Sequence, residues 1–150
     1  MRRLQSIWSL LAMAHGALLT AGCSQSPPPA AIKPVAAGYV AAADFQQLLD
    51  SSAEPILVEF GVETGCARCD ELRPQVERLA DQFSGKAKVR RINLNAERGL
   101  AAQLGVTICP TYITFVDGQE AFRTSYPTSG DLIASQLDDS INASSANNTP

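Results

Sequence analysis

The stretch of sequence that decides the fold runs from Ile56 to Cys69 and reads ILVEFGVETGCARC. Its first five residues are apolar apart from Glu59, and a short apolar run of this kind is typical of a buried strand. After the first cysteine, apolar residues recur at three- and four-residue spacing as far as Phe83, which predicts a helix with one buried face. The pattern therefore places Cys66 and Cys69 at the start of a helix that follows a buried strand.

The sequence on either side of this stretch continues to alternate between helix and strand signals. Pro74 should kink the cysteine-bearing helix, because proline lacks the N–H of a helical residue. We expect further helices at residues 42–51, 97–104 and 130–137, and further strands at residues 89–94, 111–116 and 119–123, the last two joined by a turn at Asp117-Gly118. This order predicts an α/β fold with a central mixed β-sheet flanked by helices on both faces.

Two cysteines in the spacing Cys-x-x-Cys at the start of a helix are typical of a redox-active pair. Unpaired backbone N–H groups at a helix N-terminus stabilise a thiolate at Cys66, and the charge of Arg68 would add to this effect. Cys69 follows one turn later and is expected to be more buried, as a resolving thiol should be. A structural disulfide and half of a zinc site remain open, although a zinc site needs four ligands and only Cys109 could supply a further thiol.

The N-terminus carries the features of an export signal. Two arginines precede a largely apolar, uncharged run from Leu4 to Leu19, which is the pattern of a signal peptide. The run ends in LTAGC at Cys23 and resembles a bacterial lipobox. We therefore expect residues 1–22 to be a lipoprotein signal peptide and Cys23 to carry the lipid. A plain signal peptide and an uncleaved membrane anchor are the alternatives.

Composition divides the rest of the chain into three parts. Residues 23–38 contain the lipidated cysteine and four prolines among alanines and serines, a composition that favours an extended tether. Residues 39–140 are expected to form one globular domain, and residues 141–150, rich in Asn, Ser and Ala, a disordered tail. These features predict a protein of the bacterial cell envelope that faces away from the cytoplasm and is held to the membrane by its lipid.

Charge and the position of the one histidine exclude several classes of function. The chain has 150 residues and a net charge of −3, so it offers no basic surface for nucleic acid. Its single histidine, His15, lies in the expected signal peptide. The domain therefore cannot form a Cys-His or Ser-His catalytic pair, nor a metal site with histidine ligands.

Several motifs together resemble the thioredoxin family over residues 42–139. The sequence VTICPT from Val106 to Thr111 is similar to the segment that carries the family's cis-proline, and the following YITFVDG is similar to its next strand and turn. Pro74, five residues after Cys69, matches the proline that kinks the family's active-site helix. The resemblance implies a thioredoxin fold with a cis Cys109–Pro110 bond that faces the two cysteines.

The resemblance also implies which residues bind substrate. In this family the backbone before the cis-proline pairs with the substrate chain. Cys109 and Pro110 are therefore expected to bind substrate, together with Ala67 and Arg68 from between the redox cysteines.

Glu59 resembles the family's buried acid, which implies that it relays a proton from Cys69 during disulfide exchange. The alternative is a glutamate at the strand end that is turned to solvent. Arg91 lies where the family often keeps a lysine near the acid. It is expected either to pair with Glu59 or to be exposed.

Several features depart from the common thioredoxin pattern. Gly61 and Gly65 stand where thioredoxin has tryptophans, Ser125 replaces a glycine of the substrate-facing loop, and the loop before Cys66 is one residue longer. These differences predict a narrower range of partners than that of a general thioredoxin. Ala67-Arg68 in place of Gly-Pro should favour the thiolate, and hence a more oxidising couple.

The sequence thus predicts a thiol–disulfide oxidoreductase for exported proteins, in which Cys66 attacks the substrate and Cys69 resolves the mixed disulfide. We expect a monomer that needs no organic cofactor or metal. Reduction is the expected direction, because the domain lacks room for the helical insertion of periplasmic oxidases or the dimerisation region of isomerases. That direction requires a membrane electron donor.

Two alternatives come from other classes of function. One is a binding module in which Cys66, Cys69 and Cys109 hold a soft metal such as Cu(I). The other is a scaffold lipoprotein that does not use its thiols. Cys109 either packs as a small hydrophobic residue or takes part with the other two thiols.

Overall fold

The apolar run before the cysteines forms the central strand of a sheet in the computed structural model, which describes residues 37–147. This strand, β2 (Ile56–Gly61), is buried along its whole length. It pairs in parallel with β3 (Lys88–Asn93) and in antiparallel with β4 (Thr111–Val116). With β1 (Gly38–Tyr39) and β5 (Gln119–Ser125) at the edges, the strand order is β1-β3-β2-β4-β5. The predicted mixed sheet is confirmed.

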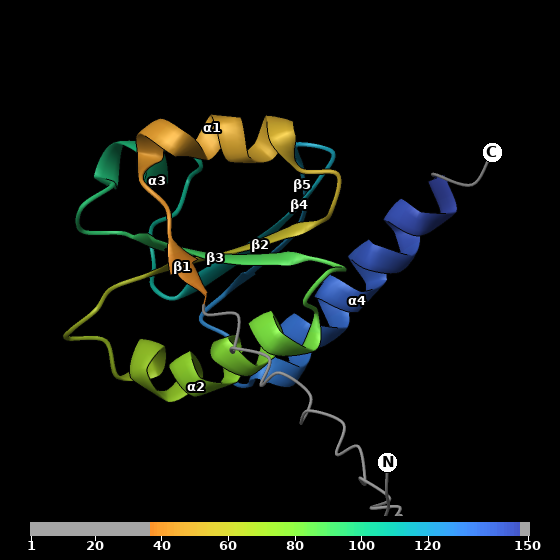
Figure 1. Ribbon diagram of the computed structural model, residues 1–150. Helices are drawn as coiled ribbons and strands as arrows, with labels where there is room; N and C mark the ends of the chain where they lie inside the picture. The colour runs from red at the N-terminus through yellow and green to blue at the C-terminus, as the bar shows by residue number, and fades with distance from the viewer. Residues whose placement is uncertain (1–36, 148–150) are drawn as a thin grey trace, which may run out of the picture. The chain divides into compact units, whose positions relative to one another are not determined.

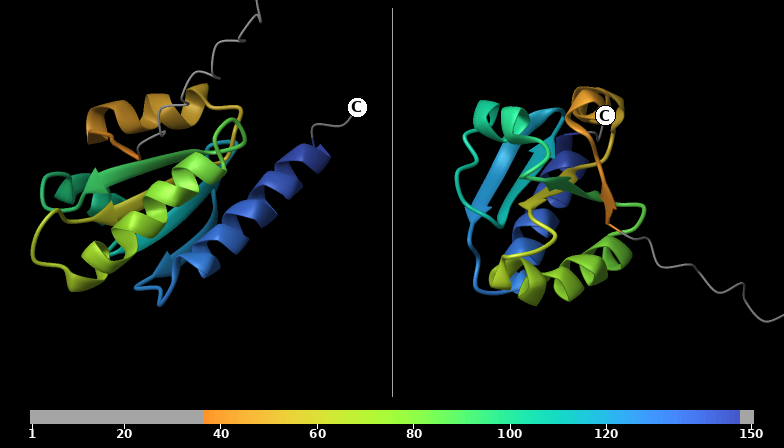
Figure 2. Two further views of the ribbon diagram at one scale, coloured as in Figure 1. Left: turned by 60° about the horizontal axis from the view of Figure 1, so that its bottom comes forward. Right: turned by 90° about the vertical axis from the view of Figure 1, so that its left-hand side faces the viewer.

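Two helices cover each face of the sheet, as Figure 1 shows. On one face lie α1 (Ala42–Ser51) and α3 (Arg98–Gln103), and on the other lie α2 (Ala67–Gln82) and α4 (Gly130–Asn147). The views in Figure 2 show α2 and α4 next to each other along their shared face. This is the thioredoxin fold expected from the sequence.

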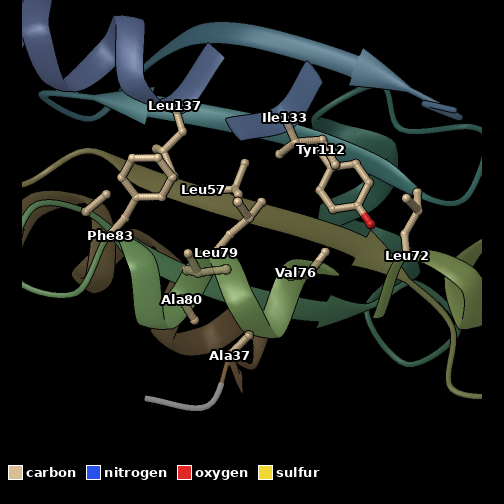
Figure 3. Close-up of a cluster of buried hydrophobic side chains, with 12 residues drawn as sticks. Ala37, Leu57, Leu72, Val76, Leu79, Ala80, Phe83, Tyr112, Ile133 and Leu137 are labelled. Atoms are coloured by element: carbon tan, nitrogen blue, oxygen red, sulfur yellow. The ribbon is translucent and has the colours of Figure 1, made fainter. Parts of the chain in front are cut away.

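The alternation of side chains along β2 divides the interior into two hydrophobic clusters. Ile56, Val58 and Phe60 pack in the cluster that contains residues of α1 and α3. Leu57 belongs to the cluster that contains residues of α2 and α4, shown in Figure 3. Glu59, two residues further along, points to the same face as Leu57. The only charged residue of β2 is therefore directed towards the helix that begins with the two cysteines.

The structure extends the domain at both ends beyond its expected limits. Ala37 and Gly38, assigned from the sequence to the tether, belong to the folded domain, and the Ala37 N–H donates to Oε2 of Glu77 at 3.1 Å. At the other end, the expected disordered tail is helical as far as Asn147, where α4 ends. Ile141 packs against the cluster of α2 and α4, and Ser144 is buried. Tertiary contacts stabilise both segments. Neither segment carries a strong sequence pattern for a strand or a helix, so the sequence did not predict that they are folded.

The expected signal peptide, the lipidation site Cys23 and almost all of the expected tether lie outside the described residues. Of the helices formed by residues 37–147, none combines the length and the apolar character needed to cross a membrane.

Candidate active site

The two cysteines form a disulfide at the N-terminal end of α2. Cys66 is the N-cap of the helix, and its Sγ accepts a hydrogen bond from the backbone N–H of Cys69 at 3.0 Å. The Cα atoms of Cys66 and Cys69 are 5.2 Å apart, within the usual range for a disulfide. A side-chain oxygen usually satisfies the free N–H groups at a helix start, and here the sulfur of Cys66 takes that position. The same N–H would stabilise a thiolate after reduction.

The two sulfur-bearing residues differ in exposure as a nucleophile and a resolving thiol should. Cys69 is 1% exposed and lies on the face of α2 that also buries Leu72 and Val76. Cys66 is only partly buried. Cys66 is therefore the more accessible of the two residues, and the assignment of nucleophile and resolving thiol stays a prediction.

The peptide bond between Cys109 and Pro110 is cis, as the resemblance implied. The carbonyl oxygen of Cys109 lies 3.9 Å from Sγ of Cys66, so the segment before the proline faces the disulfide. The backbone N–H of Tyr126 donates to the Pro110 carbonyl at 2.8 Å. This bond ties the cis-proline segment to the end of β5.

Two hydroxyl groups also hold the cis-proline segment in place. Thr111 donates from Oγ1 to the carbonyl of Ile108 at 2.7 Å, and its Oγ1 lies 3.0 Å from Oγ of Ser125. Because the single Thr111 proton is used on Ile108, Ser125 must be the donor in the second bond. Ser125, which replaces a glycine of the thioredoxin pattern, thus helps to hold the cis-proline loop.

Cys109 brings a third sulfur to the site. It is a free cysteine of intermediate exposure. The Sγ atoms of Cys66, Cys69 and Cys109 all lie within 4.8 Å of one another. The cis-proline segment therefore places the free Cys109 thiol next to the two bonded sulfurs, as expected if Cys109 takes part with them.

Glu59 and Arg91 form a buried ion pair on the sheet face that α2 covers. The two residues are register partners on β2 and β3, and Nε of Arg91 donates to Oε2 of Glu59 at 2.8 Å. Glu59 is 3% exposed and Arg91 is 6% exposed. The predicted pair is confirmed, and the alternatives of an exposed Glu59 and an exposed Arg91 are wrong.

Arg91 has a second carboxylate partner, Glu77 on α2, which the sequence analysis did not identify. Burial disfavours the charged guanidinium, but its bonds and charge interactions with Glu59 and Glu77 outweigh this effect and raise the pKa of Arg91. The arginine thus stays charged and offsets the cost of burying the Glu59 carboxylate.

Tyr112 completes a row of polar groups across the sheet. It is the register partner of Glu59 on β4, so both side chains point to the same face. Tyr112 is 2% exposed, and its hydroxyl makes no hydrogen bond among the described residues. Burial and the negative charge of Glu59 raise the pKa of Tyr112 far above its ordinary value. Strand alternation was the signal in the sequence that could have identified this neighbour.

The small residue at Gly61 leaves room for the carboxylate of Glu59. A Cβ atom added to Gly61 would lie 3.0 Å from Oε1 of Glu59, closer than most real Cβ contacts. Glu59, Gly61, Arg73 and Arg91 also line a narrow gap in the structure. The oxygen of Glu59 that is not bound to Arg91 therefore faces Gly61, where thioredoxin has a tryptophan.

Arg68 lies between the two bonded cysteines in the sequence, and its guanidinium interacts with two other side chains. Its guanidinium carbon is 5.3 Å from the ring centroid of Tyr126, and its Nη1 donates to Oε2 of Glu71 at 2.7 Å. The effect of Arg68 on Cys66 is therefore weaker than that of a free cation. Ala67, the first residue of α2, is exposed.

Two exposed apolar residues belong to the loops that carry and hold the cis-proline, and the sequence analysis did not identify them. Ile108 is 45% exposed and precedes Cys109, while Tyr126 is 48% exposed and follows β5. Exposed apolar side chains that lie together are typical of surfaces that bind other molecules.

Comparison with known proteins agrees with this geometry. The thioredoxin family model matches residues 36–139. Thioredoxin 1 of Synechococcus elongatus is 36% identical over 85 residues, which cover 57% of this chain and 78% of that protein. Thioredoxin of Haemophilus influenzae is 34% identical over 77 residues, which cover 51% of this chain and 71% of that protein.

A similarity in fold extends to solved structures. A mutant thioredoxin from Halobacterium salinarum matches with a TM-score of 0.65 and 23% identity, covering 73% of this chain and 95% of that one. At this identity the match bears on the fold alone.

Proposed function

The chain belongs to the thioredoxin family, and on that premise we propose that it reduces disulfides of exported proteins through Cys66 and Cys69. The observation that carries the proposal is the unequal exposure of two bonded cysteines at a helix N-terminus that faces a cis-proline. A disulfide with a purely structural role would not require an accessible sulfur atom that faces a cis-proline segment.

The first step is attack by the Cys66 thiolate on a substrate disulfide. A bond forms between Cys66 Sγ and one substrate sulfur, and the other substrate sulfur leaves as a thiolate that takes a proton from solvent. The Cys69 N–H that lies 3.0 Å from Cys66 Sγ stabilises the attacking thiolate. The cis-proline segment that faces Cys66 and the exposed Ile108 and Tyr126 would hold the substrate chain.

The second step releases the reduced substrate. Cys69 loses its proton and attacks Cys66 Sγ, the mixed disulfide breaks, and the second substrate thiolate leaves and is protonated. The protein is left with the Cys66–Cys69 disulfide seen in this structure. Glu59, on the sheet face covered by α2, is the buried carboxylate that we assign to accept the Cys69 proton.

Two parts of the proposal, that the substrates are exported and that the protein acts as a reductant, are supported by the sequence and by the order of elements in the domain. The leader with its candidate lipidation site at Cys23 supports a position at the outer side of a bacterial membrane. Within residues 37–147, the connections between strands hold no inserted helical region of the kind that periplasmic oxidases carry. A reductant in an oxidising compartment must be reduced again by a membrane electron donor.

Trapping of mixed disulfides tests the proposal. In Cys69→Ala, substrates should stay bound to Cys66 and appear as adducts that a reducing agent removes. In Cys66→Ala, adducts should be few and insulin reduction should be lost. Equal trapping by the two variants, or faster alkylation of Cys69 than of Cys66 at neutral pH in the reduced protein, would contradict the roles assigned here.

A further inference from the structure

We propose that the reduced protein binds one Cu(I) ion through the sulfur atoms of Cys66, Cys69 and Cys109. Binding requires only that the Cys66–Cys69 disulfide can be reduced, and it does not depend on the identity of any protein substrate. It rests on the convergence of three Sγ atoms within 4.8 Å of one another.

The spacing of the sulfurs fits a three-coordinate metal. A metal about 2.3 Å from each of three thiolates, the usual metal–sulfur length, needs sulfurs about 4 Å apart. Reduction moves the sulfurs of Cys66 and Cys69 out of bonding distance, while the sulfur of Cys109 is already near both. Small side-chain rotations would therefore complete the triangle.

The backbone that carries the three cysteines is fixed independently of any metal. Cys66 and Cys69 belong to the start of α2, whose first turn is closed by the bond from Asp70 N–H to the Cys66 carbonyl at 3.1 Å. Cys109 is held through its neighbours, by the bonds from Thr111 to Ile108 and from Tyr126 to Pro110. The donor set is thus preorganised by two separate elements.

The donors favour Cu(I) over zinc. Thiolates bind both Cu(I) and zinc, but a structural zinc site almost always has four protein ligands, whereas only three sulfurs converge here. Among residues 37–147 the sulfur cluster includes no fourth metal-binding side chain, and the sequence of that range contains no histidine. Three thiolates without a fourth ligand suit the low coordination number of Cu(I).

The surroundings suit a complex that carries negative charge. Three thiolates and one Cu(I) carry a net charge of −2, and the N-terminal end of α2 points its free N–H groups at that charge. The Cys69 N–H already lies 3.0 Å from the Cys66 sulfur. Burial of Cys69 and partial burial of the other two cysteines limit access of water to the metal.

The chemistry balances without a change in the oxidation state of copper. A dithiol reductant supplies two electrons and two protons to the Cys66–Cys69 disulfide, which becomes two thiols. Binding of Cu(I) then displaces the protons of three thiols to solvent. Copper binding and disulfide exchange use the same sulfurs and therefore exclude each other at any moment.

The experiment is a Cu(I) titration of the full chain in detergent, with Cys23→Ser as the parent so that only the three site thiols remain. The reduced protein competes for Cu(I) without oxygen against a chromophoric chelator, and X-ray absorption counts the sulfur ligands. We expect one Cu(I) per chain bound by three sulfurs at about 2.3 Å. Cys109→Val should weaken binding by more than about tenfold, a loss seen even for residues that only orient metal ligands.

Thr107→Val is the matched control, because it changes an exposed residue of the same loop without removing a sulfur. It should bind Cu(I) like the parent. The proposal is overturned if the parent binds no Cu(I), if it shows only two sulfur ligands, or if Cys109→Val binds as tightly as Thr107→Val. The number of sulfur ligands in the parent tests the proposal even if Cys109→Val fails to fold. Insulin reduction by the parent is measured in parallel, so that loss of either function is seen separately.

Discussion

Glu59 and Arg91 are register partners on adjacent parallel strands, and their side chains meet in a buried ion pair with Nε and Oε2 2.8 Å apart. This pair keeps a carboxylate in the interior, on the sheet face that α2 covers. The charge of Arg91 is divided between Glu59 and the more exposed Glu77, whose side chain is 40% exposed. The two glutamates thus share one arginine but differ in burial.

Replacement of Glu59 by Gln keeps the shape of the side chain and removes the carboxylate that we propose as the proton acceptor. We expect slower release of substrate from Cys66, with a pH profile displaced to higher pH, because Cys69 must then lose its proton to solvent. The free energy of unfolding should fall by about 2 kcal/mol, less than for a fully broken buried pair because Arg91 keeps Glu77. Stopped-flow kinetics between pH 6 and 9 and denaturant unfolding measure both effects.

Glu77→Gln is the control for this experiment, since it removes the other carboxylate that binds Arg91. Because Glu77 is partly exposed, its loss should cost less than about 1 kcal/mol. The rate of resolution should not change. If both variants slow resolution equally, Glu59 acts through the position of Arg91 and does not itself accept the proton.

The hydroxyl of Tyr112 gives a second prediction, because it is buried beside Glu59 without a hydrogen-bond partner. Tyr112→Phe removes this group and should leave stability unchanged or raise it by up to about 1 kcal/mol. A loss of more than about 1 kcal/mol would instead indicate a hydrogen bond to the hydroxyl.

The pH dependence of Tyr112 has a definite sign. Its pKa is raised in the folded protein by burial first and by the charge of Glu59 second. The contribution of the neutral hydroxyl is therefore complete below the ordinary tyrosine pKa of about 10 and is lost as the pH rises above it. Tyr112→Phe should lose less stability above pH 10 than the parent does.

A matched pair of glycine substitutions tests the space around Glu59. Gly61→Ala places a Cβ 3.0 Å from Oε1 of Glu59. Because the ion pair with Arg91 holds this carboxylate in place, the substitution should destabilise the protein by about 1–3 kcal/mol. Gly99→Ala in α3 meets nothing within 4 Å and should stabilise the helix by up to about 1 kcal/mol. Thermal unfolding compares the two, and the same sign for both would contradict the described packing.

The central elements could be predicted from sequence because their local and tertiary signals agree. The apolar strand β2, the amphipathic helix α2 and the Asp117-Gly118 turn each carry a pattern that matches the observed structure. The cis Cys109–Pro110 bond followed from the family resemblance, since a proline alone does not specify it.

The features that were missed depend on contacts between distant parts of the chain. The strand β1 has only two residues and exists because it pairs with β3. The last turns of α4 are rich in Ser and Asn, which form helices poorly on their own, and packing of Ile141 against the core supports them. In the sequence, Glu77 has the pattern of an ordinary surface residue of an amphipathic helix. Its ion pair with Arg91 becomes evident only in the folded structure.

The lipid anchor is predicted from the leader alone and can be tested in cells. Cys23→Ser should remove labelling by fatty acid and release the protein from the membrane fraction, because the acceptor of the lipid is lost. Cys109→Ser is a matched control, since it removes a different thiol and should leave labelling intact. Equal labelling of Cys23→Ser and the unchanged chain would contradict the lipoprotein assignment.

The most direct test of the redox assignment is the reduction potential of the Cys66–Cys69 pair. The full chain with Cys23→Ser is equilibrated in redox buffers, and the reduced fraction is counted by alkylation and mass spectrometry. We predict one two-electron transition between about −270 mV, the thioredoxin value, and about −120 mV, the value of a strong oxidant, because Ala67-Arg68 should favour the thiolate. A potential below about −300 mV, as structural disulfides have, would contradict the account.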